Sequence, residues 1–274
     1  MRLFIHHRTD YRFSEPQARI VQLLRLTPTS NEGQNIIDWR IDVDCNARLR
    51  PGRDGFGNET NMLYIDGPID HVGLSVSGEV LTEDRAGMLG GAPEPLPPML
   101  FLQSTACTNS SAALDAFVGE VAAAGGSGLA TAHRLNERLA ETLRFDPGAR
   151  AGARDAAATF ADGHGAPQDL AHVFISAARA LGLPARYVSG HRFTPGHDSA
   201  VQDATHAWAE AHVQDYGWIG FDPSCGRCPD DTYVRVATAL DFRGAAPLSG
   251  TRTGGGLEEL AVGVRVGTSQ GQMQ

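Results

Sequence analysis

Hydrophobic and polar residues alternate along much of the first 84 residues, and this period of two constrains the fold more than any other feature of the chain. It places one face of each strand against a core and the other in water, which is typical of antiparallel sheets. The segment Asp54-Gly55-Phe56-Gly57-Asn58 supplies glycines for a turn with positive φ. We therefore predict an antiparallel β-sandwich-like domain over residues 1–84. The alternating positions are Leu3, Ile5, Thr9, Tyr11, Phe13, Trp39, Ile41, Val43, Val72, Leu74, Val76 and Val80.

The hydrophobic period changes after a segment rich in glycine and proline. Six such residues lie between Gly90 and Pro98 and predict a linker over 85–99. Beyond it, leucines at 135, 139 and 143 fall at four-residue steps and predict a helix. Another helix is expected to begin near Pro167, with Gly182 as its C-terminal cap.

Strands follow the second helix, so we predict an α+β domain over residues 100–266, with helices packed on an antiparallel sheet. Residues 267–274 are expected to form a loose tail. The predicted strands cover residues 186–190, 206–213, 218–222 and 260–266.

Charge and cysteine content exclude several classes of protein. The net charge of −9 disfavours binding to nucleic acid or to anionic membranes, because both require surplus Lys and Arg. No run of about 18 apolar residues could span a membrane, and the N-terminus turns polar too early for a signal peptide. The four cysteines are too few and too scattered for a disulfide framework. We expect a cytoplasmic protein with reduced thiols and no cofactor.

Three segments in the second half of the chain carry candidate chemistry. They are Gly165-Ala166-Pro167-Gln168, His206-Ala207-Trp208-Ala209-Glu210 and Gly220-Phe221-Asp222-Pro223. In this order they resemble the Cys, His and Asp boxes of the transglutaminase-like superfamily. The run Leu-Gly-Leu-Pro-Ala-Arg-Tyr-Val-Ser-Gly at 181–190 is also similar to that family. Residues 1–84 resemble the β-rich N-terminal domain of its bacterial members.

The resemblance implies a papain-like fold and a thiol ester intermediate in the attack on an amide. It makes His206 the base and Asp222 the carboxylate that orients it. Gln168, Trp208 and Trp218 are predicted to wall the cleft. The nucleophilic cysteine, however, is replaced by Pro167.

Proline at this position removes two catalytic groups. It has no thiol, and it lacks the backbone N–H that helps to stabilise the oxyanion. Proline is nonetheless favoured at the first position of a helix, so the fold should survive. We therefore predict a natural pseudoenzyme whose cleft binds a peptide or protein, with an active paralogue as a further candidate partner.

Two alternatives rest on Cys225-Gly226-Arg227-Cys228. With a tight turn near residue 216, Cys225 could lie roughly opposite His206 and act as a relocated nucleophile, although no helix N-terminus would activate its thiol. The C-x-x-C pair could instead bind zinc with His197, His206 or His212, or belong to a purely structural scaffold. A single pair without a second at the expected spacing is a weak zinc signal, so we predict no metal site.

Overall fold

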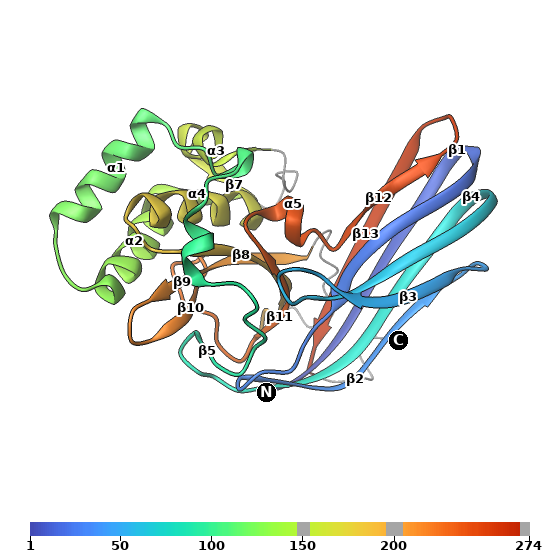
Figure 1. Ribbon diagram of the computed structural model, residues 1–274, viewed down its shortest axis with the longest axis horizontal. Helices are drawn as coiled ribbons and strands as arrows, with labels where there is room; N and C mark the ends of the chain where they lie inside the picture. Colours follow the sequence, from blue (N-terminus) through green and yellow to red (C-terminus); the bar gives the residue numbers. More distant parts are fainter. Residues whose placement is uncertain (147–153, 196–204, 269–274) are drawn as a thin grey trace.

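The computed structural model describes residues 1–146, 154–195 and 205–268. Figure 1 shows a part built of long strands beside a part in which helices cover a smaller sheet. The strands form a six-stranded sheet, a five-stranded sheet and a pair of two short strands. This mixed α+β architecture with antiparallel sheets agrees with the sequence-based prediction.

Two long strands organise the first sheet. β1 (Arg2–Thr27) and β4 (Glu59–Thr82) pair antiparallel over most of their length, and β2 (Gln34–Val43) and β3 (Arg48–Arg53) flank β4. A register shift between Arg12 and Gln17 divides β1 into two halves. Side chains from both halves, such as Tyr11 and Leu24, share one buried cluster. The two halves of the sheet therefore cover a common core, as in a sandwich.

The last two strands return to this first sheet. β13 (Glu258–Gly267) pairs with the first half of β1, and β12 (Leu248–Thr253) pairs with the second half. The predicted strand at 260–266 is present, but its partner is β1 and not a strand of the second sheet (Figure 1). Alternation reveals a buried face without revealing the strand beside it.

The second sheet has the order β11-β8-β9-β10-β5. Its buried alanines at 207, 209 and 211 pack in one cluster with Phe174 and other residues of the helices. Since side chains alternate along a strand, His206, Trp208 and Glu210 point to the opposite face. The strands are β5 (Met88–Leu89), β8 (Ala185–Arg192), β9 (His206–Val213), β10 (Gly217–Phe221) and β11 (Tyr233–Ala239).

Helices cover the face of this sheet that bears the alanines. α4 (Pro167–Ala180) lies directly on it and is buried along most of its length. Gly182 follows with φ +78 and its N–H bonds to the carbonyl of Arg179, so the predicted cap is confirmed. The other elements are η1 (Pro98–Leu102), η2 (Ala106–Thr108), α1 (Ala112–Ala123), α2 (Gly128–Thr142), α3 (Ala156–Asp162), α5 (Phe242–Ala245) and the parallel pair β6 (Arg144–Phe145) and β7 (His164–Gly165).

The predicted linker joins the second sheet. Its residues Met88 and Leu89 form β5, and the Glu94 carboxylate accepts two hydrogen bonds from Arg186 at 2.6 and 2.8 Å. Glycine and proline content predicted irregular backbone but not these contacts. In the described parts of the chain, no helix is long and apolar enough to cross a membrane.

The two sheets share a packed interface. Leu3 and Ile5 of β1 form one buried cluster with Phe193 and Val234 from the second part. The side chain of Gln34 bridges the same boundary, donating to the carbonyl of Arg235 at 2.9 Å and accepting from its N–H at 2.7 Å.

Candidate active site

The β9–β10 hairpin positions the two polar residues of the candidate site. Phe221 pairs with Ala209, so Asp222 continues the strand toward Trp208 and has His206 as its diagonal neighbour. The turn between the strands places Asp215 and Gly217 at φ values of 70° and 77°. His206 Nε2 and Asp222 Oδ2 lie 2.7 Å apart, and Asp222 is fully buried. The two residues that the resemblance selected therefore meet.

Two residues besides His206 donate hydrogen bonds to the Asp222 carboxylate. Tyr233 donates its hydroxyl to Oδ2 at 2.7 Å, and Ser224 donates both its backbone N–H and its hydroxyl to Oδ1. Arg192 lies 3.7 Å from Oδ2. Burial opposes ionisation, but the charge of His206 and the hydrogen bonds from His206, Ser224 and Tyr233 hold the pKa of Asp222 well below its usual range.

The hydrogen bond to Asp222 uses one ring nitrogen of His206 and leaves the other available for proton transfer. Because Nε2 of His206 bonds to the carboxylate, Nδ1 is the atom that could exchange a proton with a nucleophile. The aromatic rings of Trp208 and Tyr233 lie 6.3 and 5.7 Å from the imidazole, measured between centroids. Burial and the charge of Asp222 raise the pKa of Tyr233 well above its usual value, so its hydroxyl stays a donor.

Pro167 is the first residue of α4, as the sequence predicts. The preceding residue, Ala166, donates its backbone N–H to the Asp169 carboxylate at 3.2 Å, which caps the helix from within its first turn. Gln168 donates its amide to the carbonyl of Thr205 at 3.0 Å, and so ties the start of α4 to the residue before His206. A nucleophile at the Pro167 position would thus stand at a helix N-terminus beside β9, but proline supplies none.

Cys225 lies in a different place from the one that the sequence indicated. The backbone turns at once after Asp222, whose carbonyl accepts from Gly226 N at 2.9 Å, so Cys225 does not extend the hairpin opposite His206. Its Sγ contacts the Tyr233 hydroxyl at 3.7 Å and the Asp222 carbonyl at 3.8 Å. The interaction with Cys225 raises the pKa of the Arg227 guanidinium.

The two tryptophans that were predicted to wall the cleft lie in different parts of the second sheet. Trp208 packs against His206 and Tyr233, next to the candidate site. Trp218 lies elsewhere on the sheet, with the Arg186 guanidinium 3.8 Å from the centre of its ring and Phe101 edge-on at 5.1 Å. Its role is the packing of a buried ion-pair network.

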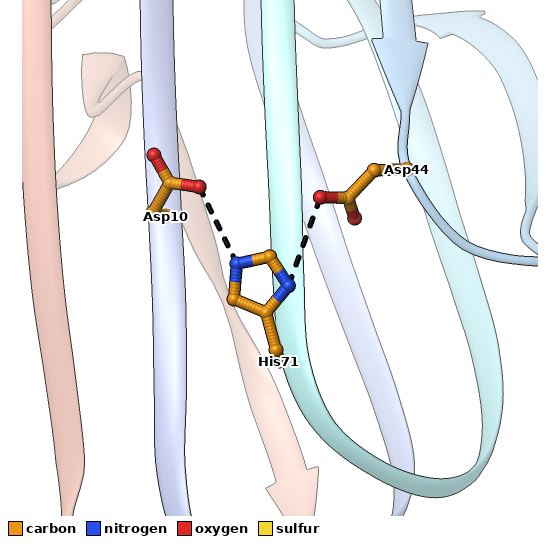
Figure 2. A group of neighbouring side chains, drawn as sticks. All are labelled: Asp10, Asp44 and His71. Atoms are coloured by element: carbon orange, nitrogen blue, oxygen red, sulfur yellow. Dashed lines mark ion pairs between the residues drawn. The ribbon is translucent and has the colours of Figure 1, made fainter.

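Within the described residues, one group of side chains could hold a metal, and it does not include the C-x-x-C pair. Figure 2 shows His71 between Asp10 and Asp44, at 3.4 and 3.7 Å, on the first sheet. Arg8 already pairs with both carboxylates, so the group is explained as an ion-pair cluster. His197, one of the ligands considered for zinc, lies outside the described residues. Burial raises the pKa of Cys228 to about 11, which disfavours a thiolate ligand.

Comparison with known proteins agrees with this geometry. The family model of the transglutaminase-like superfamily matches residues 115–223, and that of the bacterial transglutaminase-like N-terminal region matches residues 3–81. The chain belongs to the transglutaminase-like superfamily. The core match ends just after Asp222, and it contains both His206 and the Pro167 position.

The relatives of this transglutaminase-like chain include bacterial proteins of similar length. An uncharacterized protein of Mycobacterium tuberculosis is 29% identical, covering 90% of this chain and 86% of its own length. One from Mycobacterium leprae is 26% identical and covers 97% and 98%. The crystal structure of a putative cysteine protease from Cytophaga hutchinsonii superposes with a TM-score of 0.77 at 20% identity, over 97% of this chain and 90% of that one. The likeness to this structure shows the same fold.

Sequence reasoning missed three residues that surround Asp222. Tyr233 at the start of β11 and Arg192 at the end of β8 reach it across the sheet, and no local motif reveals such contacts. Ser224 follows two residues after Asp222, and this spacing is typical of a turn in which a carboxylate accepts from the backbone. That signal was available in the sequence.

Proposed function

We propose that this transglutaminase-like protein has lost thiol catalysis and uses its cleft to bind a peptide or protein. The observation that carries the proposal is Pro167 at the first position of α4, beside an otherwise complete His206–Asp222 pair. Loss of the nucleophile in a triad typically reduces turnover by about 10⁶-fold. Because proline also lacks the N–H of an oxyanion hole, chemistry by the family route is negligible.

The survival of the His206–Asp222 pair has a structural reason that does not require catalysis. Asp222 is fully buried and accepts hydrogen bonds from the His206 ring, the Ser224 backbone and the Tyr233 hydroxyl. Loss of His206 or another hydrogen-bond donor would leave the buried Asp222 carboxylate without full compensation of its charge, which destabilises the folded protein. The network can therefore be kept for stability after the thiol is gone.

Thiol reactivity tests the proposal without a substrate. The native protein is labelled with limiting iodoacetamide at neutral pH, and the modified cysteines are mapped by mass spectrometry beside a His206→Ala variant. Slow labelling of all four cysteines, equal in both proteins, is the expected result. Fast labelling that depends on His206 would overturn it.

One observation favours a second candidate, an amidohydrolase or peptidase that uses Cys225. The sulfur lies 3.7 Å from the Tyr233 hydroxyl and interacts with the Arg227 guanidinium, and a neighbouring cation is a common feature of reactive cysteines. The same labelling distinguishes the two functions, because this candidate requires Cys225 to react first. Its Arg227→Gln variant should then label more slowly.

The Pro167→Cys substitution tests whether the rest of the site is intact. A thiol placed at the start of α4 gains the helix dipole and a nearby imidazole. We expect rapid alkylation at residue 167, which is reduced when His206→Ala is added. A thiol as slow as Cys45 would show that the site has lost more than its nucleophile.

A further inference from the structure

A pocket that is partly open to solvent lies where the first sheet meets the second. Asn31, Gly33 and Glu83 line it from the first part of the chain, and Trp208 and Tyr233 line it from the second. These two aromatic residues also contact His206. The pocket is therefore adjacent to the His206–Asp222 pair, on the face of the sheet that carries both.

Trp208 presents a donor without a partner to this pocket. Its side chain spans the sheet between two glycines, with one ring edge against Gly190 and Nε1 against Gly220. Gly220 and the neighbouring Pro229 both line the pocket. Trp208 is only 2% exposed, and its Nε1 forms no hydrogen bond with a described residue. This N–H is not one of the buried polar atoms that lack a partner, so it is accessible from the pocket, where a ligand can offer an acceptor.

The arginines that line the pocket are in ion pairs, whereas two of its carboxylates are not. Both lining guanidiniums are neutralised, Arg235 by Glu210 at 2.7 Å and Arg85 by Glu32 at 2.8 Å. The lining carboxylates of Glu83 and Asp230 have no cation within 4 Å among the described residues, although the charge of Asp230 acts on Arg227. Asp230 Oδ1 accepts from Thr232, which leaves Oδ2 for another donor. The pocket therefore carries two carboxylates without a direct ion-pair partner, one from each part of the chain.

We infer that this pocket binds a basic residue of an extended peptide. The side-chain cation pairs with Asp230 and Glu83, and a main-chain carbonyl of the same peptide accepts from Trp208 Nε1. This inference rests on the proposed binding function and names the chemistry of its ligand. A cationic ligand between the two carboxylates, one after β4 and one before β11, would also hold the two parts of the chain together.

Nuclear magnetic resonance of the indole N–H groups tests the inference directly. The chain has three tryptophans, and a Trp208→Phe variant assigns the resonance of Trp208. The probe is acetyl-Gly-Lys-Gly-amide, compared with peptides carrying norleucine or glutamate in place of lysine. The lysine peptide should shift the Trp208 resonance in a saturable way, and the other two should not. Pentylamine, which has the cation without the carbonyl, should leave that resonance in place.

Charge-removing variants provide the matched controls. Asp230→Asn and Glu83→Gln should each weaken the lysine peptide by about fivefold to tenfold, and together should abolish binding. Asp215→Asn removes one charge from the exposed turn at the far end of the β9–β10 hairpin and should change nothing. Equal binding of the norleucine peptide, or an unmoved Trp208 resonance at saturation, would overturn the inference.

The outcome is independent of the thiol experiment. A shift of Trp208 together with rapid His206-dependent alkylation would overturn the pseudoenzyme while supporting the pocket. Slow alkylation with no peptide shift would support the loss of catalysis and overturn the pocket.

Discussion

Asp222 is the residue on which the candidate site depends most. It is an ionised carboxylate with no exposed surface, and its two oxygens are shared among His206, Tyr233 and Ser224. The resemblance to the family predicted its partnership with His206, but the register of the two strands could not be fixed from the sequence. It could not predict Tyr233, because that contact depends on β11, which is not a neighbour of β10 in the sheet.

The Tyr233→Phe substitution measures what the hydroxyl contributes. It removes one donor from a buried carboxylate and preserves the ring that packs on Trp208. Hydrogen bonds to charged groups contribute about 1.5–3 kcal/mol, so the free energy of unfolding in urea should fall by that amount. Tyr216→Phe is the control, since Tyr216 lies exposed in the hairpin turn. Equal stabilities of the two variants would contradict the prediction.

At the scale of elements, helix ends were predictable and strand partners were not. Pro167 and Gly182 mark α4 because each satisfies a local backbone requirement at a helix end. β13 was recognised from its alternating valines, but only the three-dimensional structure shows that it pairs with β1. A strand buried on one face can join any sheet with a matching row of side chains.

One position in β8, Gly190, has no room for a side chain. A Cβ on Gly190 would lie 2.2 Å from the carbonyl oxygen of Val234 and 2.7 Å from the Trp208 ring. Gly190→Ala should therefore destabilise the protein by about 1–3 kcal/mol through overpacking. Gly119→Ala is the matched control, because a Cβ in the middle of α1 meets no atom within 4 Å. It should stabilise by about 0.5–1 kcal/mol in the same urea series, since alanine favours helix over glycine. A loss of stability in both variants would refute the argument.

For the whole molecule, the boundary between the two sheets contains buried histidines that no sequence pattern singles out. His7 of β1 and His191 of β8 lie edge to face with ring centroids 6.0 Å apart, and both are 2% exposed. Alternation predicted buried strand positions but could not show that residues 184 positions apart share one interface. The net charge of −9 likewise gives no information about the contact between these two histidines.

These histidines should make the folded protein sensitive to mild acid. Burial, with the charge of His6, lowers the pKa of His7 to about 4; burial, with the charges of His7 and His206, lowers that of His191 to about 3. In the unfolded chain both protonate near pH 6.5, so the unfolded state binds more protons between that pH and about 4. Their contribution is therefore complete above pH 6.5 and is lost as the pH falls. The slope approaches about 1.4 kcal/mol per pH unit for each histidine.

Urea unfolding of the wild type and of a His7→Gln/His191→Gln double variant, at about pH 7.5 and about pH 5, measures this loss. The variant should be less stable at the higher pH, because glutamine fills the sites imperfectly. It should nevertheless lose less stability between the two pH values, since two titrating groups are gone. His172, whose pKa burial also lowers to about 4, is unchanged in both proteins and so cancels from the comparison. Parallel losses in the two proteins would mean that the histidines at this boundary do not control its response to acid.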